Sequence, residues 1–165
     1  MPPKIKVQSP AAVVGLSVVT LGVYLLVWYH RVNREMRDLG RAYGDVVLAM
    51  SRPAHSAWAL GAGGVVVVPA IVSIMHAMDR IRRCERMFAR NTDAGTTVVA
   101  LVSAAMATGF GAAFSTASST ALALAVTSTV LWLTAAAEIQ RRLNALWRQE
   151  LSLTGPEHPD VVAAV

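Results

Sequence analysis

The 165-residue chain has little charge, few aromatic residues and one cysteine, and each shortage excludes a class of protein. Charged residues make up 15% of the chain and hydrophobic residues 55%, so it is too apolar for a disordered segment or an ordinary small soluble domain. A single cysteine excludes an internal disulfide, a CxxC redox pair and a four-thiolate zinc site. The composition therefore predicts an integral membrane protein.

Three long runs contain no charged residue, and they predict where the chain crosses the membrane. The first is Val7 to Tyr29, and the second, Pro53 to Met78, is interrupted by glycines and a proline. The third, Ala94 to Ala137, has 44 residues, whereas one span needs about 20, so it must form a hairpin that turns within 109–120. The runs predict an all-α membrane bundle with four spans, at about residues 10–29, 56–77, 95–113 and 119–137.

Three polar segments carry apolar residues at helical spacing and predict amphipathic helices on the membrane surface, at 31–44, 79–90 and 138–151. Their apolar stripes are Val32, Met36, Leu39 and Tyr43; Ile81, Cys84 and Phe88; and Ile139, Leu143, Leu146, Trp147 and Leu151. Residues 1–155 are then one membrane domain, and residues 156–165 are a frayed tail.

The positions of the basic residues predict the orientation in the membrane. With four crossings, ten of the fifteen basic residues share one side with both termini, and five lie in the 30–52 loop on the other side. Both termini are therefore expected in the cytoplasm of a bacterial cell, with the chain in the plasma membrane. The five arginines of that loop conflict with the positive-inside rule. In an alternative topology the first two runs are re-entrant, and all fifteen basic residues stay inside.

The string TLGVYLLVWYHRVNREMRDLG, from Thr20 to Gly40, is the most distinctive motif. It resembles the signature T-L-G-x-Y…W-Y…N-R-E-x-R-D-L-G of a bacterial domain-of-unknown-function family of small multi-pass membrane proteins. The resemblance continues in PAHSAWAL, DRIRR and IQRRLNALW, in the same order. It implies the multi-pass architecture, and it implies no substrate or reaction. The bias toward arginine, alanine, valine and glycine indicates a GC-rich, actinobacterium-like source.

Charged residues beside the spans are the candidates for contact with anionic lipid or a membrane partner. Those candidates are Arg80, Arg82, Arg83, Arg86 and Arg90 after the second span, and Asn33, Arg34, Glu35, Arg37 and Asp38 after the first. The alternative readings are that these arginines only set the topology, and that the charged network only anchors the first span.

Aromatic and small residues suggest how the spans are held. We expect the aromatic side chains to anchor the chain at the headgroup level, at Tyr24, Trp28, Tyr29, Trp58 and Trp147. Small residues repeat every seven positions on the last two spans and predict a packing seam of Thr97, Ala104, Gly111, Thr120, Thr127 and Thr134. The rival reading is that these threonines line an aqueous path.

The residues that would carry chemistry are few. His76 and Asp79 share a helix face, but a catalytic metal needs about three protein ligands, so an interfacial histidine is favoured. Cys84 is expected to be a small apolar residue of its stripe. No catalytic set, metal site, cofactor site or nucleic-acid-binding fold can be assembled.

The sequence favours a non-enzymatic interaction or scaffold protein that contacts anionic lipid or a membrane-protein partner, with a homo-oligomer also open. The alternative is a subunit of a small oligomeric channel or transporter. A membrane enzyme acting on lipid is the least favoured reading, because the chain offers no convincing nucleophile.

Overall fold

The computed structural model describes residues 6–62, 67–88 and 95–154, and these ranges contain helices and no strand. The predicted all-α fold is therefore confirmed for the described chain. The helices are α1 Pro10–Val19, α2 Val23–Tyr43, α3 Val46–Ala49, α4 Pro53–Ala62, α5 Val67–Met87, α6 Gly95–Phe114 and α7 Ser118–Thr154. The tail predicted at 156–165 lies outside the described residues.

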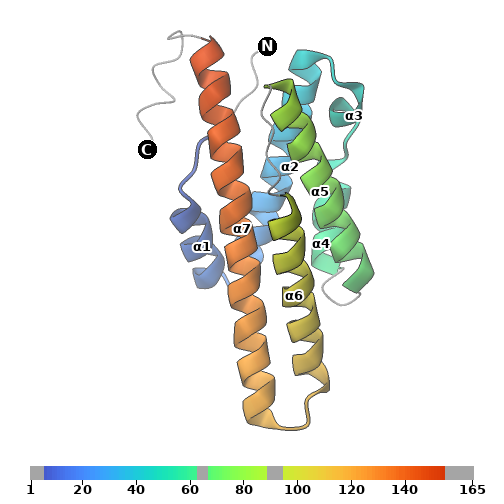
Figure 1. Ribbon diagram of the computed structural model, residues 1–165, viewed down its shortest axis with the longest axis vertical. Helices are drawn as coiled ribbons and strands as arrows, with labels where there is room; N and C mark the ends of the chain where they lie inside the picture. Colours follow the sequence, from blue (N-terminus) through green and yellow to red (C-terminus); the bar gives the residue numbers. More distant parts are fainter. Residues whose placement is uncertain (1–5, 63–66, 89–94, 155–165) are drawn as a thin grey trace.

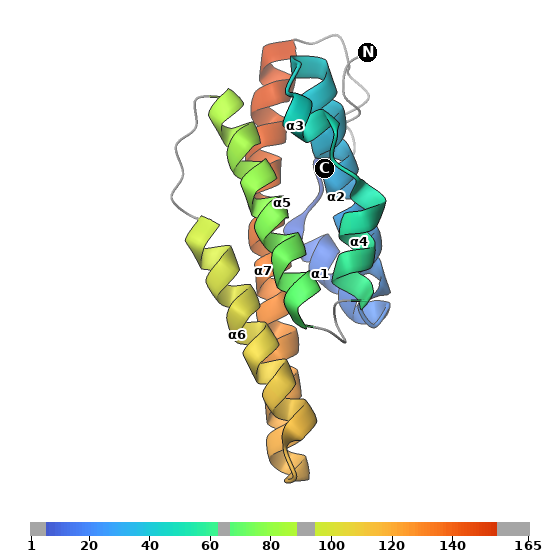
Figure 2. The same ribbon diagram turned by 90° about the vertical axis from the view of Figure 1, so that its right-hand side faces the viewer.

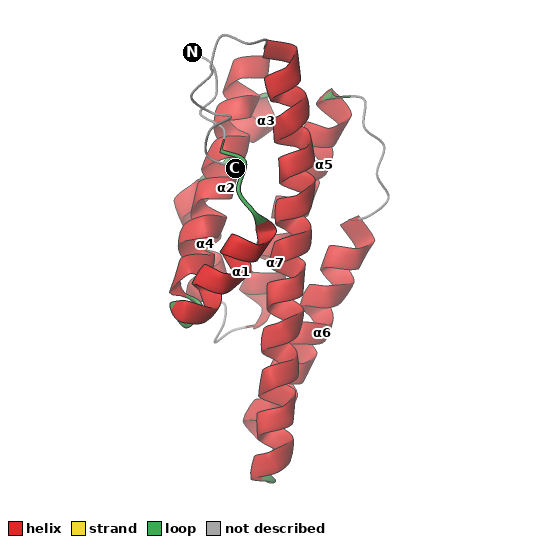
Figure 3. Cartoon of the chain, turned by 90° about the vertical axis from the view of Figure 1, so that its left-hand side faces the viewer, coloured by secondary structure: helices red, strands yellow, loops and turns green. Residues whose placement is uncertain are grey.

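The first apolar run is divided into two helices that reverse direction, as Figures 1 and 3 show for α1 and α2. At the corner Leu21 has φ +51° and Gly22 φ +89°, and glycine adopts this left-handed conformation without steric cost. The Thr20 hydroxyl donates to the Leu16 carbonyl at 2.8 Å and accepts from the Tyr24 amide at 2.9 Å. It thus satisfies backbone groups on both sides of the break. The sequence predicted one continuous span over 10–29, and the structure instead has two helices that meet at this corner.

The second apolar run also contains two helices, since α4 ends at Ala62 and α5 begins at Val67. Figures 1 and 2 show α4 and α5 running in opposite directions. Pro69 falls in the first turn of α5, where its missing amide costs no helical hydrogen bond. The predicted interruption at Gly63 and Gly64 lies outside the described residues.

The third run forms the predicted hairpin. Helix α6 ends at Phe114 and α7 begins at Ser118, so the turn falls within the predicted 109–120 segment. Helix α7 then continues without a break to Thr154, so no boundary separates a span ending at 137 from a surface helix beginning at 138. Its 37 residues make a rod of about 55 Å.

The contact between α6 and α7 leaves five of the six predicted seam residues on exposed faces. Thr120, Thr127 and Thr134 are exposed, as are Thr97 and Ala104, and Gly111 is half-buried. The hydroxyls of Thr127 and Thr134 donate to carbonyls of their own helix, those of Ala123 and Val130.

The two helices instead meet where the Ser128 hydroxyl donates to the Ala105 carbonyl at 2.7 Å. A Cβ on Gly109 would lie 3.0 Å from the Ser128 Oγ, so glycine allows this close approach. Of the six predicted seam residues, Gly111 lies at the contact, since its Cβ would lie 3.4 Å from the Leu124 side chain, and the other five lie on exposed faces.

The core lies where the three predicted amphipathic stripes meet. Their buried members are Val32, Met36 and Leu39 of α2, Ile81, Cys84 and Phe88 of α5, and Ile139, Leu143, Leu146 and Trp147 of α7. All predicted members except Tyr43, which is exposed, and Leu151, which is half-buried, therefore belong to a core in which the three stripes pack against one another. Each buried aliphatic or aromatic side chain stabilises the bundle by about 1.5–3 kcal/mol.

Gly40 brings α2 against the short helix α3. A Cβ at this position would lie 2.9 Å from the Ala49 backbone nitrogen and 3.0 Å from the Leu48 carbonyl carbon. Because these are backbone atoms, they cannot move aside as a flexible side chain can. The last glycine of the Thr20–Gly40 motif is thus needed for close packing.

We expect Gly40→Ala to lower the free energy of unfolding by about 1–3 kcal/mol, because the methyl group forces α3 away from α2. Gly15→Ala is the matched control, since a Cβ on Gly15 meets nothing within 4 Å and alanine favours the helix by up to about 1 kcal/mol. Thermal unfolding in detergent measures both. Equal stability of the two variants would contradict the close approach at Gly40.

Candidate functional site

The molecule separates an apolar half from a charged half along α7. Two helices of the described chain are long and apolar enough to cross a membrane, Thr96–Phe114 and Ser118–Ser152. Only 17% and 11% of their most apolar windows are buried, so they are unlike the core helices of a soluble protein. The basic residues of the described ranges lie outside α6 and the first half of α7, on α2, α5, the second half of α7 and the segments before α1 and α4.

A chain of buried amides joins the N-terminal segment, α2 and α7 at the boundary between the two halves. The Trp28 indole donates to the Gln140 Oε1 at 2.6 Å, and the Gln140 amide donates to the Asn144 Oδ1 at 2.7 Å. The Asn144 Nδ2 donates to the backbone carbonyl of Gln8 at 2.7 Å, and the backbone amide of Gln8 donates to the Asn144 Oδ1 at 3.2 Å. These bonds hold three elements in one register.

A second buried cluster joins α2, α4 and α5. The Tyr29 hydroxyl donates to the Ser73 carbonyl at 2.8 Å, and the Ser73 hydroxyl donates to the Ser56 carbonyl at 2.9 Å. The Arg80 guanidinium donates to the Asn33 Oδ1 and, at 3.2 Å, to the Ser56 Oγ. Partial burial lowers the pKa of Arg80 from its ordinary value, because the charged guanidinium loses contact with water.

These clusters change the role of several predicted anchors. Trp28, Tyr29 and Trp147 are buried in the core. Tyr24 is half-buried and accepts a hydrogen bond from Gln8. Trp58 has 75% of its surface exposed, and its role as an interface anchor stays a prediction. The sequence showed aromatic residues at span ends, and the fold uses three of them to hold the bundle together.

The predicted lipid and partner residues also divide between core and surface. Asn33 and Glu35 are buried, and Arg80 belongs to the cluster described above. Arg34, Arg82 and Arg86 are exposed, Arg37, Asp38 and Arg83 are half-buried, and Arg90 lies outside the described residues. Among the described members, the exposed arginines offer the most surface to a lipid headgroup or a partner.

Most of these charges are paired. Two i,i+4 pairs form on α2, as the spacing of these residues favours, Arg31 with Glu35 at 3.4 Å and Arg34 with Asp38 at 3.9 Å. Asp38 also lies within 3.4 Å of Arg37 and 3.6 Å of Arg41. The charged end is therefore held by an ion-pair network on α2.

A buried ion pair between α5 and α7 was not predicted from the sequence. Arg142 lies 3.9 Å from Glu85 and 3.2 Å from Glu138, and Arg142 and Glu85 are both buried. A buried charge is costly unless it is paired, so these residues depend on one another. The sequence does contain a sign of these buried polar contacts, because the polar residues Gln140, Arg142 and Asn144 stand among the apolar residues of the 138–151 stripe.

The described residues offer no cluster of three or more histidine, cysteine or acidic side chains that could hold a metal ion. His76 and Asp79 are both exposed, and Asp79 pairs with Arg82 at 3.7 Å. Cys84 is fully buried, as predicted, and burial raises its pKa to about 12. A thiol with this pKa stays protonated at neutral pH and is a poor nucleophile.

Glu35 is the buried acid with a strongly shifted pKa. Burial away from water raises its pKa from 4.5 to about 7, and the Arg31 guanidinium offsets only part of that shift. The carboxyl therefore takes up a proton near neutral pH. Its neighbours also include Asp38 on the same helix, Lys6 from the segment before α1 and Trp147 of α7.

Because the pKa of Glu35 is higher in the folded chain, the folded state binds the proton more tightly than the unfolded state. The resulting stabilisation is fully present below about pH 4.5 and is lost as the pH rises through 7. We expect the stability to fall by about 2–3 kcal/mol over this window and Glu35→Gln to remove most of that fall. Thermal unfolding from pH 4.5 to 8 measures it.

Asp79→Asn is the control for this pH series, since Asp79 is an exposed acid whose side chain is 67% accessible. Its stability profile should keep the slope of the unsubstituted chain. An unchanged slope in Glu35→Gln would contradict the buried, protonating carboxyl.

Comparison with known proteins finds one family. The sequence model of a domain of unknown function, DUF4234, matches residues 8–145. This match agrees with the resemblance seen in the Thr20–Gly40 motif, while the motif itself and an actinobacterial source stay predictions. No curated protein and no solved structure matches the chain.

Proposed function

We propose that this chain, which belongs to the DUF4234 family, is a non-enzymatic membrane interaction protein. In this proposal α6 and α7 cross the bilayer, and the charged end binds anionic lipid headgroups or a membrane-protein partner. The observation that carries the proposal is the separation of exposed apolar surface from arginines along α7. In a membrane, this distribution places the apolar surface in the hydrocarbon core and the arginines in the headgroup region and the water beyond it.

The apolar half supports insertion in a bilayer. Its helices expose large apolar side chains, among them Leu21, Phe110, Phe114, Leu122, Val126 and Val130. Moving apolar surface of this kind from water into the hydrocarbon core of a bilayer is favourable by about 25 cal/mol per Å². The charge-free part of α7, residues 118–137, is about 30 Å long and matches the hydrocarbon core of a membrane.

The two helix reversals support the re-entrant topology over four spans. Because α1 and α2 turn at Leu21–Gly22 and α4 and α5 run in opposite directions, each run returns toward the end from which it came. In this topology all fifteen basic residues lie in the cytoplasm with both termini, and the conflict posed by the five arginines of 30–52 disappears. We place the protein in a bacterial plasma membrane on this basis.

Single-cysteine labelling in intact cells tests this topology. In a Cys84→Ala background we expect Ala42→Cys, at an exposed site on α2, to be protected from a membrane-impermeant maleimide and labelled after permeabilisation. A four-span chain places residue 42 outside, where it reacts in intact cells. Thr116→Cys, in the turn between α6 and α7, is outside in both topologies and serves as the positive control.

Removing exposed arginines tests the lipid contact. Each basic residue near an anionic surface contributes about 1 kcal/mol of attraction, so the triple variant Arg34→Gln, Arg82→Gln, Arg86→Gln should retain several-fold less acidic phospholipid in detergent. Raised salt should reproduce the loss in the unsubstituted chain. Asp79→Asn should have the opposite effect, because it frees Arg82 from its ion pair. Unchanged lipid content in the triple variant would leave these arginines with a topological role only.

A further inference from the structure

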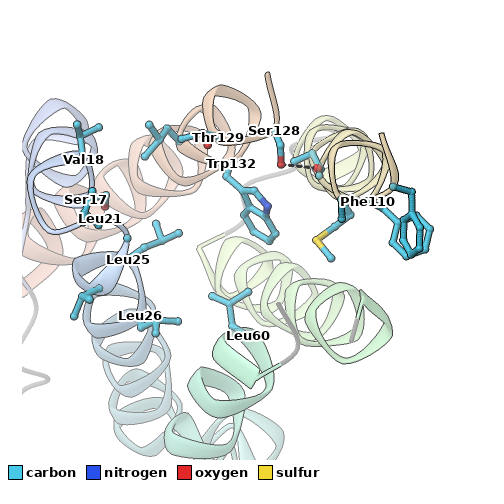
Figure 4. Close-up of a pocket in the computed structure, with 18 residues that line it drawn as sticks. Ser17, Val18, Leu21, Leu25, Leu26, Leu60, Phe110, Ser128, Thr129 and Trp132 are labelled. Atoms are coloured by element: carbon cyan, nitrogen blue, oxygen red, sulfur yellow. Dashed lines mark hydrogen bonds between the residues drawn. The ribbon is translucent and has the colours of Figure 1, made fainter. Parts of the chain in front are cut away.

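A large apolar groove lies between the α1–α2 corner and the α6–α7 hairpin, with one wall completed by α4. Its volume is about 1090 Å³, slightly above the range of about 300–1,000 Å³ that is usual for small-molecule pockets. Figure 4 shows the Trp132 ring between Leu25 and Leu60 on one side and α6 on the other. The groove is therefore built from segments far apart in the sequence.

The groove wall offers little to a polar ligand. No charged residue is found among the described residues of its wall, where the side-chain donors are the Trp132 indole and three hydroxyls that already donate to backbone carbonyls. Ser17 donates to the Val13 carbonyl at 2.7 Å, Ser128 to that of Ala105 at 2.7 Å, and Thr129 to that of Ala125 at 2.9 Å. Water in the groove would face an apolar wall with these donors already used, so an apolar occupant is favoured.

The groove ends where the buried polar clusters begin. Leu25 lies one helical turn before Tyr29 on α2, and Leu60 lies one turn after Ser56 on α4. Tyr29 and Ser56 both belong to the hydrogen-bonded cluster with Ser73. An occupant therefore has an apolar slot that opens to the apolar half and is closed off from the charged end.

We propose that this groove binds an acyl chain of a membrane phospholipid. The inference rests on the proposed membrane insertion, since the groove walls continue into the exposed apolar surface at Val18, Leu21, Phe110 and Phe114. In a bilayer this surface meets lipid chains, and the adjoining groove is open to the same chains. A bound chain fills the space that the short α1–α2 corner leaves beside the long hairpin.

Quenching of Trp132 by brominated acyl chains tests the proposal. Trp132 lines the groove, Trp28 and Trp147 are buried at the charged end, and Trp58→Phe removes the exposed tryptophan. The chain is reconstituted in vesicles of bromine-labelled phosphatidylcholine and phosphatidylglycerol and then washed extensively in detergent. Surface lipid exchanges for detergent, whereas a chain held in the groove stays, so we expect at least half of the quenching to persist.

A matched pair of threonines on α7 provides the controls. Thr129 lines the groove and Thr127 does not, although both are exposed and both donate to their own helix. Thr129→Phe should fill the groove beside Trp132 and abolish the persistent quenching, while Thr127→Phe should leave it unchanged.

Three results overturn the inference in distinguishable ways. Complete loss of quenching on washing, in a chain that resists alkaline carbonate extraction from membranes, refutes the groove site and leaves the proposed insertion standing. Absence of quenching in vesicles, with a dimer that Thr129→Phe converts to a monomer, assigns the groove to a second copy. Extraction by alkaline carbonate refutes both the insertion and the bound chain.

Discussion

The unbroken helix α7 is the element on which the rest of the structure depends. Its first half is charge-free and exposed, and its second half carries a buried apolar stripe within a polar sequence. Helices α1, α5 and α6 pack directly on it, and α2 reaches it through the bonds from Trp28 to Gln140 and from Tyr43 to Glu150. A helix maintains its backbone hydrogen bonds in either solvent, so one rod can pass from an apolar environment into a polar one.

Buried polar side chains lie at the boundary between the apolar half and the charged half, and they form hydrogen bonds with one another. The amide chain of Gln8, Asn144 and Gln140 lies on one side of α2, and the cluster of Tyr29, Ser73, Ser56 and Arg80 joins α2 to α4 and α5. An unpaired polar group here would cost about 1–3 kcal/mol, so each partner constrains the register of the next. This layer also closes the upper end of the acyl groove, which links the stability of the bundle to the shape of the proposed lipid site.

Much of the local structure follows from the sequence because it depends on residues within one or two helical turns. The three apolar stripes, the ion pairs of Arg31 with Glu35 and Arg34 with Asp38, the buried Cys84 and the turn between α6 and α7 are all of this kind. Periodicity identifies which face of a helix is apolar. Periodicity does not say whether lipid or another helix covers that face. For this reason the sequence predicted helices on the membrane surface, whereas in the structure the same apolar faces form the core of a bundle.

The sequence by itself determined that the chain is helical, that its charges and its longest apolar run are separated, and that the run from 94 to 137 must fold back on itself. Only the tertiary structure decided that Leu21 and Gly22 reverse the first apolar run, that Trp28 is buried and Arg80 half-buried, and that Ser128 and not Thr127 meets α6. Each of these depends on partners 23 to 112 residues away in the chain, or on how two helices pack after the turn. A residue's hydropathy and its near neighbours do not encode such pairings, because they are selected by the joint packing and hydrogen bonding of the whole bundle.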